Sequence, residues 1–497
     1  MPSRPARFAI SAALAAILIL LPLAGKLKQC HAAAARSDQP DPALPGATTQ
    51  KDQTDLSVTV YNSNLALVRD VRQIRLASGV FPLRFEDVAA NILPATVHFR
   101  SLSDPAKLGV LEQNYEYDLL DQNSLLKKFV GRELLVSHSE IVDGQMKWVL
   151  GKGTLISDNN GATVWKIGDE IVTNVQPYSY PDVPSDLYSH PTLIWTLENR
   201  GADAQRVEAS YLTNNMNWSA DYVLTVARDE KSADLDGWVT LVNNSGVAYD
   251  HARLQLVAGN VHRSEQNDMR VRDYAALEVA APAKVAQFQQ ENFSEFHLYT
   301  LDRRTSIQNN ETKQISLLAG TNIPVEKYLS VEGQQYWYRN PQGIGNAILQ
   351  PVNVFYKFKN DQKSNLGMPL PAGTVRVYQA DSKGAVQFAG ENTIRHTPKD
   401  EDVRVYVGDA FDVVCERKQM DYKKLASNLA EFEYQITLRN HKDSAVGVEV
   451  REPVGGDWEV VNSNYKWTKL DATTIGFSIP VEKDSAATLD YRVRVKW

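Results

Sequence analysis

The best polar candidate for a binding site in the sequence is IRHTPKDEDVRV, residues 394 to 405. His396, Lys399, Asp400, Glu401 and Asp402 stand close together, and such a group could bind a cation or act in acid-base chemistry. Turns also collect polar residues for structural reasons, so a solvated hairpin turn between GAVQFAG and VRVYVGDAFDVV is the favoured interpretation. His396, Asp400 and Glu401 remain candidate binding residues.

The aromatic run QQYWYRN at residues 334 to 340 is the second candidate binding segment. If the run is a strand, Tyr336, Trp337 and Tyr338 point alternately to the two faces of a sheet, which could leave at least one ring exposed. An exposed ring could stack on a sugar or contact a protein. Aromatic residues are also common inside sheets, so core packing is the favoured alternative.

No other segment has the spacing of a known catalytic or metal-binding motif. The sequence lacks a G-x-S-x-G elbow, an H-E-x-x-H helix, a Walker loop and paired cysteines for zinc, so we assign no catalytic residue and predict no metal or cofactor. Cys415, in the strand-like run FDVVCER, is expected to be a buried structural thiol. A carboxylate pair assembled from distant strands would leave no sequence signature, so the question of enzyme activity stays open, with binding favoured.

The elements that hold these candidates are expected to be strands. Apolar and polar residues alternate with a period of two through much of the chain, and only DYKKLASNLAEFE near residues 421 to 433 has a brief helical pattern. Between residues 133 and 174, three strand-like runs are separated by Asp143-Gly144 and Asn160-Gly161, which predicts a β-meander or small barrel. The fold class expected is mainly β, with several β-sandwich or small barrel modules in tandem and little helix.

A short phrase recurs three times, as TLEN at residues 196 to 199, TLVN at 240 to 243 and TLRN at 437 to 440. We interpret each phrase as a strand that ends in Asn, because the Asn side chain can hydrogen-bond its own backbone and so favours leaving the ladder. Asn199 and Asn440 are also followed at similar distances by Trp218 and Trp458. One sandwich-like module could therefore be used twice, although independent selection of the same strand-end residues is an equal alternative.

Residues 1 to 35 predict an export signal. Two arginines precede an almost continuous apolar run from 8 to 25, and small residues near Ala35 offer a cleavage point. The length of the run and the two lysines beyond it leave a retained anchor as the alternative. The segments expected in order are a signal peptide or N-terminal anchor (1–35), a flexible linker (36–55), an N-terminal β domain (56–185), a first sandwich-like module (186–270), a mobile Ala/Gln-rich loop (271–292), a central β module (293–420) and a C-terminal sandwich-like module (421–497).

The charge of the chain restricts its partners. The formal net charge is -7, and cleavage after Ala35 would remove four basic residues and no acid, which would leave -11. Nucleic acids and anionic membranes are bound by basic surfaces, so neither is expected to bind the body of the protein, and membrane contact is expected only through an N-terminal anchor. We expect a periplasmic or extracellular location and an envelope protein or polysaccharide as partner.

Several segments resemble one known family. NNMNWSADYVL, the stretch from LDGWV to GNVHR, and above all the block that contains LPAGTVRVY, HTPKDE and GDAFDV are similar to the bacterial envelope family catalogued as domain of unknown function 4139. The resemblance covers residues 185 to 497 and implies an exported, β-rich protein with no established catalytic residue to transfer. Relatives described as mucoidy-inhibitor-A-like tend to carry a coiled coil before this region, whereas this chain has a β-rich segment without heptads.

The favoured hypothesis is an exported envelope protein that works by non-catalytic binding or scaffolding. One alternative is a hydrolase of envelope polymers whose carboxylates gather at a module interface near residues 394 to 402. The other is a surface adhesin or assembly partner that uses an exposed sheet edge.

Overall fold

A computed structural model shows the arrangement of the strands in space. It describes residues 46–116, 121–142, 145–159, 161–184, 187–188, 190–259, 261 and 287–497, so the expected export segment lies outside the described residues. Strands account for 65% of the described residues and helices for 5%, in several separate sheets, which confirms the prediction of a mainly β protein with tandem modules. In the part of the chain that is described, no helix is both long enough and apolar enough to cross a membrane.

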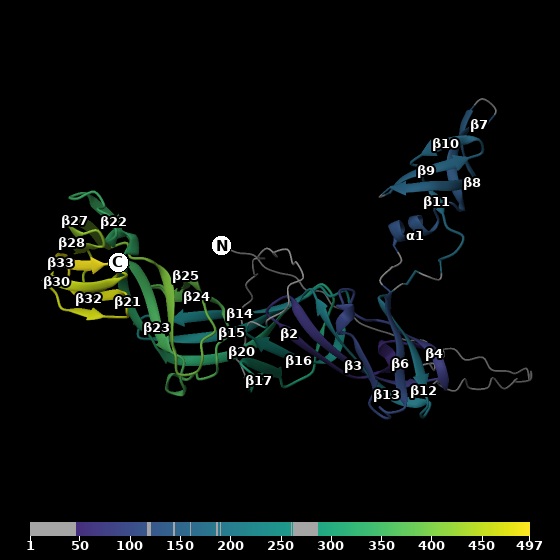
Figure 1. Ribbon diagram of the computed structural model, residues 1–497, viewed down its shortest axis with the longest axis horizontal. Coiled ribbons are helices and arrows are strands. Elements are labelled where there is room, and N and C mark those ends of the chain that lie inside the picture. The colour runs from purple at the N-terminus through teal and green to yellow at the C-terminus, as the bar shows by residue number, and fades with distance from the viewer. Residues whose placement is uncertain are drawn as a thin grey trace, which may run out of the picture. The chain divides into compact units, whose positions relative to one another are not determined.

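Two sheets pack face to face in the N-terminal sandwich (Figure 1). The smaller sheet consists, in spatial order, of β1 (Ala47–Thr48), β4 (Gly79–Phe85), β12 (Thr192–Asn199) and β6 (Leu108–Glu116). The larger sheet consists of β17 (Phe288–Phe293), β18 (Phe296–Leu301), β16 (Tyr249–Ala258), β2 (Gln53–Tyr61), β3 (Leu65–Arg75), β13 (Ala204–Asn214) and β5 (His98–Ser101), with β19 (Thr305–Ile307) also paired to β16. Trp195 joins the two layers, because its ring stacks on Phe99 of the larger sheet at 4.3 Å and meets Phe85 of its own sheet edge-on at 5.5 Å.

A smaller module is inserted between β6 and β12. Its sheet has the order β10 (Glu170–Thr173), β9 (Ala162–Ile167), β8 (Gln145–Asn159), β7 (Glu133–Val142) and β11 (Tyr178–Ser179), which confirms the predicted meander. The sheet and helix α1 (Gln122–Lys128) share a core around Trp165. Helix α1 was not predicted, although Asp121 marks its start by accepting hydrogen bonds from the backbone N–H groups of Asn123 and Ser124.

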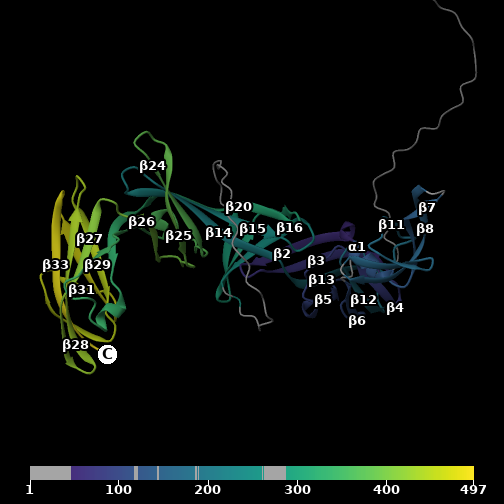
Figure 2. The same ribbon diagram turned by 90° about the horizontal axis from the view of Figure 1, so that it is seen from above.

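The remaining strands form a middle sheet and a C-terminal sandwich (Figure 1 and Figure 2). The middle sheet consists of β20 (Glu311–Pro324), β15 (Ser232–Asn243), β14 (Met216–Val226), β24 (Gly373–Ala380) and β25 (Val386–Ile394). One layer of the C-terminal sandwich is the six-stranded sheet β26 (Asp402–Asp409), β23 (Asn353–Lys359), β21 (Glu326–Glu332), β29 (Val446–Pro453), β32 (Thr474–Val481) and β31 (Trp467–Lys469). The other layer is the sheet β22 (Ala347–Gln350), β27 (Val413–Ala426), β28 (Leu429–Asn440), β33 (Ser485–Lys496) and β30 (Asp457–Ser463). Short 3-10 turns occupy Gln50–Asp52, Pro94–Thr96, Gln335–Tyr338 and Gln362–Ser364.

The helix expected near residues 421 to 433 is wrong, since this segment is the hairpin of β27 and β28. Tyr422 lies opposite Phe432, and their ring centroids are 5.3 Å apart. Glu431 forms an ion pair of 2.7 Å with Arg494 of the neighbouring strand β33. These cross-strand contacts stabilise the sheet more than the weak helical preference of the segment stabilises a helix.

Each recurrent TLxN phrase ends a strand, as predicted. Asn199, Asn243 and Asn440 are the last residues of β12, β15 and β28, and all three are buried. Each Oδ1 accepts a hydrogen bond from the N–H two residues later, at Gly201, Ser245 and Lys442 respectively. Each Nδ2 donates to a carbonyl of the following turn, at Ala202, Val247 and Ser444. The strand after each Asn belongs to a different sheet, so these Asn corners carry the chain from one sheet to another.

Strands from both sides of residue 185, where a domain boundary was predicted, pair in the same sheets. Strand β12 pairs with β4 and β6, and β13 pairs with β3 and β5. The proposed domain boundaries remain predictions.

Most of the loop expected at 271–292 lies outside the described residues. Its end does not form a loop, because residues from Phe288 onward form β17, where Phe288 is buried against β18.

Candidate functional site

The aromatic run at 334 to 340 is not a strand. Residues Gln335–Tyr338 form a 3-10 turn, in which Trp337 and Tyr338 are buried, with 6% and 0% of their surfaces exposed. Only Tyr336 of the three rings is exposed, at 56%. The expectation of a strand with alternating rings is therefore wrong, because the run turns into the C-terminal core instead of continuing a ladder.

Tyr338 belongs to a buried polar network inside the C-terminal sandwich. Its hydroxyl donates to Glu452 and lies 2.6 Å from the hydroxyl of Tyr491. The Arg417 guanidinium, also buried, pairs with Glu452 and lies over the Trp337 ring at 4.5 Å. The groups of this network satisfy one another, which indicates a structural role.

The candidate residues of the 394 to 405 segment do not converge on one another. His396 is exposed, and its Nδ1 accepts a hydrogen bond of 3.1 Å from the backbone N–H of Ala372. Partial burial and the neighbouring His297 lower the pKa of His396. Asp400 and Glu401 contact Asn360 through their backbones, and their exposed carboxylates form no ion pair among the described residues. The segment connects β25 and β26 of two different sheets, so the expected hairpin turn is wrong, since β26 pairs with β23 instead of β25.

Two further features bear on the chemistry of the described chain. Cys415 is buried, and burial raises the pKa of its thiol to about 12, which confirms the predicted buried cysteine. Within the described ranges, no three His, Cys, Asp or Glu side chains are grouped so that they could hold a metal ion.

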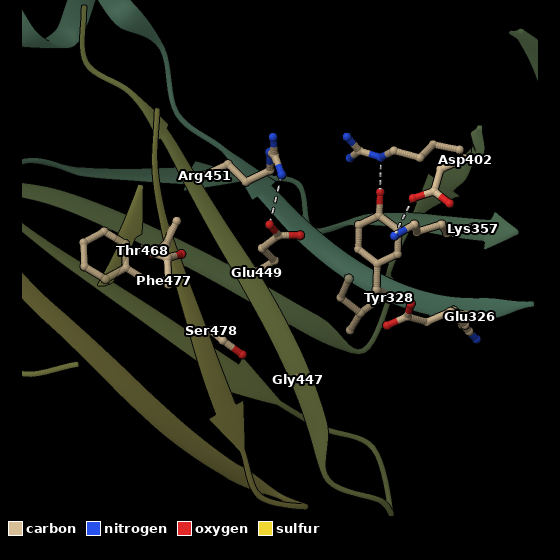
Figure 3. A pocket seen from close by; sticks show the side chains of 14 residues that line it. Glu326, Tyr328, Lys357, Asp402, Gly447, Glu449, Arg451, Thr468, Phe477 and Ser478 are labelled. Carbon is tan, nitrogen blue, oxygen red and sulfur yellow. Dashed lines mark hydrogen bonds and ion pairs between the residues drawn. The ribbon is translucent and has the colours of Figure 1, made fainter. Parts of the chain in front are cut away.

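A groove of about 580 Å³ lies on the six-stranded sheet of the C-terminal sandwich (Figure 3). Strands of this sheet place alternate residues on opposite faces. Leu329 and Val448 pair with each other and point into the sandwich core, whereas Tyr328 and Gly447, each one position earlier, lie on the outer face and line the groove. The groove volume lies within the range of about 300 to 1,000 Å³ that is typical of ligand sites.

One wall of the groove is part of an aromatic row that crosses three strands. Tyr406 of β26, Phe355 of β23 and Tyr328 of β21 are cross-strand neighbours. The rings of Tyr328 and Phe355 stack with centroids 5.2 Å apart, and Phe355 meets Tyr406 at 5.5 Å. The Arg404 guanidinium lies 5.4 Å from the Tyr328 ring centre and 5.2 Å from that of Phe355, and its Nε donates to the Tyr328 hydroxyl oxygen. Burial raises the pKa of Tyr328 while Arg404 opposes this shift.

Next to this aromatic row, the floor of the groove is formed by a glycine, Gly447, which has no side chain. Gly447 takes the position next to Tyr328 on the outer face, and a Cβ at Gly447 would meet nothing within 4 Å. Gly476 of β32 lies further along the same face, opposite Arg451. The Leu470 side chain covers the outer side of Gly476, so Gly447 is the position that leaves the recess open near the Tyr328 ring.

Charged groups on the groove are arranged in opposite pairs. Lys357 and Asp402 are 3.0 Å apart, and this contact raises the pKa of Lys357. Arg451 pairs with Glu449 at 2.9 Å (Figure 3). Partly exposed pairs of this kind present donors and acceptors to a polar ligand without concentrating one sign of charge. An open groove with an aromatic wall, a flat floor and polar rims can hold a chain-like polar molecule.

Of the groove residues, only Asp402 was named from the sequence, as a member of the charged cluster at 394 to 405, and its place in this groove was not predicted. The signal was present, since EKYLSVE, NVFYKFK and DVRVYV each alternate inward apolar residues with an outward aromatic residue. To predict that the three rings are neighbours, one must know the pairing register of strands whose residues lie up to 78 positions apart, from Tyr328 to Tyr406. That register is set by the folded sheet and has no local signature.

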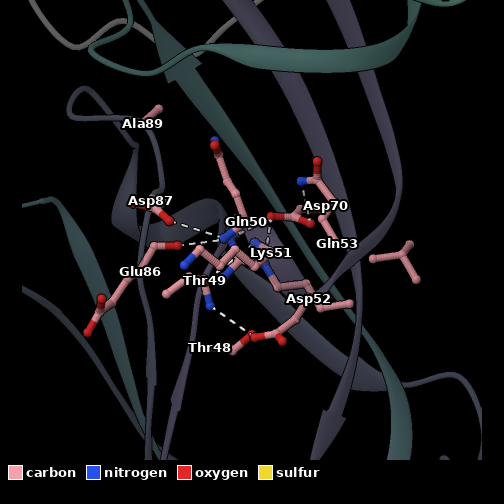
Figure 4. A network of polar contacts seen from close by, with 12 residues as sticks. Thr48, Thr49, Gln50, Lys51, Asp52, Gln53, Asp70, Glu86, Asp87 and Ala89 are labelled. Atoms are coloured by element: carbon pink, nitrogen blue, oxygen red, sulfur yellow. Dashed lines mark hydrogen bonds and ion pairs between the residues drawn. The ribbon is translucent and has the colours of Figure 1, made fainter. Parts of the chain in front are cut away.

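A second polar network surrounds the first described strand (Figure 4). The backbone N–H of Gln50 donates to Asp87 at 3.0 Å, and the Gln53 side chain donates to Asp70 at 2.8 Å. Asp70 in turn pairs with the buried Arg72 at 2.8 Å. These groups bind one another and fix the chain at the edge of the N-terminal sandwich, so the groove remains the better candidate for ligand binding.

Comparison with known proteins identifies one family. The family described as Domain of unknown function (DUF4139) matches residues 207–460, just over half of the chain. This span confirms the resemblance expected from LPAGTVRVY, HTPKDE and GDAFDV, over a shorter range than 185 to 497. It includes groove strands β21, β23, β26 and β29. No curated protein matches the chain.

Proposed function

The chain belongs to the DUF4139 family, and we propose that it is an exported, non-catalytic binding protein of the bacterial envelope that holds an extended polysaccharide in the groove of the six-stranded sheet. The observation that carries this proposal is the Tyr328 ring beside the open floor at Gly447. Sugar rings present apolar C–H faces to aromatic rings and hydroxyls to charged side chains, and this groove offers both kinds of surface. The export signal expected in residues 1 to 35 supports an envelope location.

Filling the floor of the groove tests the proposal. Gly447→Val places a side chain in open space on an extended strand, so it should block the groove without disturbing the core. Gly109→Val is the matched control, because Gly109 is also a strand glycine whose nearest neighbour, the Glu198 carbonyl oxygen, would be 4.0 Å from a new Cβ. The probes are soluble oligosaccharides of three kinds: neutral glucans, amino-sugar oligomers and uronic acid oligomers.

Ligand binding to the native state raises the thermal unfolding temperature. We expect at least one oligosaccharide to raise it for the wild type and for Gly109→Val, but not for Gly447→Val, whose unfolding temperature without ligand should match the wild type. A shift that survives in Gly447→Val would place binding elsewhere. No shift with any of the three kinds of probe would contradict polysaccharide binding.

A specific feature of the inserted module favours assembly with a protein as a second candidate function. Met146, Trp148 and Leu150 lie on one face of β8 and are 76%, 71% and 72% exposed. From Gln145 to Gly153, β8 pairs only with β7 among the described strands. An extended partner segment could add to this edge through main-chain hydrogen bonds, with its apolar side chains against the three exposed residues.

Photo-cross-linking tests this second candidate in cells. A photoreactive phenylalanine at position 148 should yield a protease-sensitive adduct with a protein. The same group at Phe411, which is 95% exposed in another module, should not. Equal labelling at both positions would indicate nonspecific exposure rather than a partner at β8.

A further inference from the structure

The groove continues beyond Gly447 into a second recess of about 440 Å³. The two recesses share Lys327, Tyr328, Leu329 and Gly447, so a chain-like ligand beside Tyr328 would extend into the second one. The second recess lies at the ends of β21 and β29, between the turn that joins β14 to β15 and the Asn corner after β28.

Three lysines line this second recess, each from a different segment. Lys231 follows the β14–β15 turn, Lys327 is the second residue of β21, and Lys442 lies in the corner after Asn440. The backbones that carry two of them are fixed: the Lys442 N–H donates to Asn440 Oδ1 at 3.0 Å, and the Lys231 carbonyl accepts from Val325 N–H at 3.0 Å. The lysine positions are therefore set by the fold.

Of the three lysines in the recess, two form no ion pair with the carboxylates described there. Glu230 binds Lys327 at 2.7 Å and also accepts from Gln379 at 3.1 Å. Burial acts to raise the pKa of Glu230, but Lys327 and Gln379 outweigh it and lower this pKa, so Glu230 is ionised and neutralises Lys327. Asp229 accepts from the backbone N–H of Lys231, and among the described residues neither Lys231 nor Lys442 has a carboxylate within ion-pair distance.

Building on the proposed polysaccharide groove, we infer that this second recess is a subsite for an anionic substituent of the bound polymer, a carboxylate or a phosphate, held by Lys231 and Lys442. The local excess of positive charge stands out because the chain as a whole has a formal net charge of -7. The paired charges beside Tyr328 would contact the sugar backbone, and the unpaired lysines at the end of the groove would select for acidic repeat units.

The test compares acidic oligomers with a neutral one, on the full-length protein. The probes are an oligogalacturonate, its neutral methyl ester and an oligo(glycerol phosphate), with affinities measured by calorimetry at low and high salt. The acidic oligomers should bind more tightly than the ester, and this preference should weaken at high salt. Lys231→Gln and Lys442→Gln should each reduce acidic affinity by about two- to fivefold, as expected for exposed ion pairs. Both should leave the affinity for the methyl ester unchanged.

Lys363→Gln and Lys383→Gln, two exposed lysines outside both recesses, are the charge-matched controls and should retain the preference. Tighter binding of the phosphate oligomer than of the uronate would assign the substituent as phosphate, and the reverse order would assign it as carboxylate. Equal binding of the acidic and neutral oligomers, or a preference that persists in Lys231→Gln/Lys442→Gln, would overturn the subsite and leave the proposed groove intact. Failure of every oligomer to bind would overturn the proposed function as well.

Discussion

The rings of Tyr328 and Phe355 stack across two neighbouring strands with their planes 11° apart, and the Arg404 guanidinium lies near both rings. This stack restricts the orientation of the Tyr328 ring, which lines the same groove as Gly447. A side chain that forms a binding wall must keep one orientation before the ligand arrives, since ordering it on binding would cost affinity.

Tyr328→Ala should therefore abolish measurable oligosaccharide binding while lowering the free energy of unfolding by only about 1 to 2 kcal/mol, because the residue is half-buried on the outer face. Tyr328→Phe keeps the ring and removes only the oxygen that accepts from Arg404, so it should retain most of the affinity. Calorimetric titration and urea unfolding of both variants would check this. Equal loss of binding in the two variants would assign the effect to the Arg404 contact instead of the ring.

The buried network of Arg417 and Glu452 yields a prediction about stability. Burial alone would lower the pKa of Arg417, but its attraction to Glu452 outweighs this and raises it well above the ordinary value, so the guanidinium stays charged inside the core. Glu452→Gln leaves that charge without its partner and should lower the free energy of unfolding by about 3 to 5 kcal/mol. Urea unfolding followed by tryptophan fluorescence would measure the loss.

The double variant Arg417→Met/Glu452→Leu is the control for this prediction. It removes both charges, and Tyr338 and Tyr491 can still bond to each other, as their hydroxyls are 2.6 Å apart. Replacing a buried ion pair by apolar groups is often close to neutral, so the double variant should be more stable than Glu452→Gln. A double variant less stable than the single one would show that the pair contributes net stability.

The sequence predicted the features that depend on local chemistry. Asn199, Asn243 and Asn440 end their strands as expected, because an Asn side chain bonds to the backbone within a few residues. The period-two pattern predicted the strands for the same reason. Trp337 was harder to place, since its burial depends on Arg417, far away in the chain.

Features that depend on pairing between distant segments were not predictable in the same way. The 421 to 433 hairpin has enough Ala, Leu and Lys to suggest a helix, and only its neighbour β33, with the ion pair from Arg494 to Glu431, accounts for the strands. The groove arises from the same kind of information. Gly447 alone does not indicate a binding site in the sequence, and only the folded sheet brings it to the groove that Tyr328 lines.

Replacing the Asn of a corner should lower the free energy of unfolding more than replacing an exposed Asn. Asn440 has the most partner residues, because its Nδ2 lies within hydrogen-bond distance of three carbonyls, those of Ser444, Glu482 and Val481, at 2.8, 3.0 and 3.3 Å. Asn440→Ala leaves buried backbone groups unsatisfied and should lower the free energy of unfolding by about 1 to 3 kcal/mol. Asn462→Ala, at an exposed position of the same sandwich, should change it by less than about 0.5 kcal/mol. Similar losses in the two variants, measured by urea unfolding, would argue against a special role of the corner.

Buried tyrosines predict how stability depends on alkaline pH. Burial raises the pKa of Tyr338 and Tyr491 in the C-terminal core, and of Tyr211 and Tyr222 in the core that the N-terminal sandwich and the middle sheet share, well above the ordinary value of 10.0. The folded state therefore keeps these hydroxyls protonated at a pH where the unfolded chain ionises them. Stability from this source is complete below about pH 10 and is lost as the pH rises above it, by about 1.4 kcal/mol per pH unit for each such tyrosine.

Urea unfolding midpoints from pH 7 to pH 11, together with the ultraviolet absorbance of tyrosinate, would check this dependence. We expect a nearly constant contribution from the tyrosines up to pH 9 and a steep fall above pH 10. Tyrosinate from the buried residues should form only as the protein unfolds. Tyr338→Phe/Tyr491→Phe removes two of the ionisable groups and should make the alkaline fall less steep than in the wild type. A stability that does not change above pH 10, or buried tyrosinate that forms while the protein remains folded, would contradict the assignment of these tyrosines to closed cores.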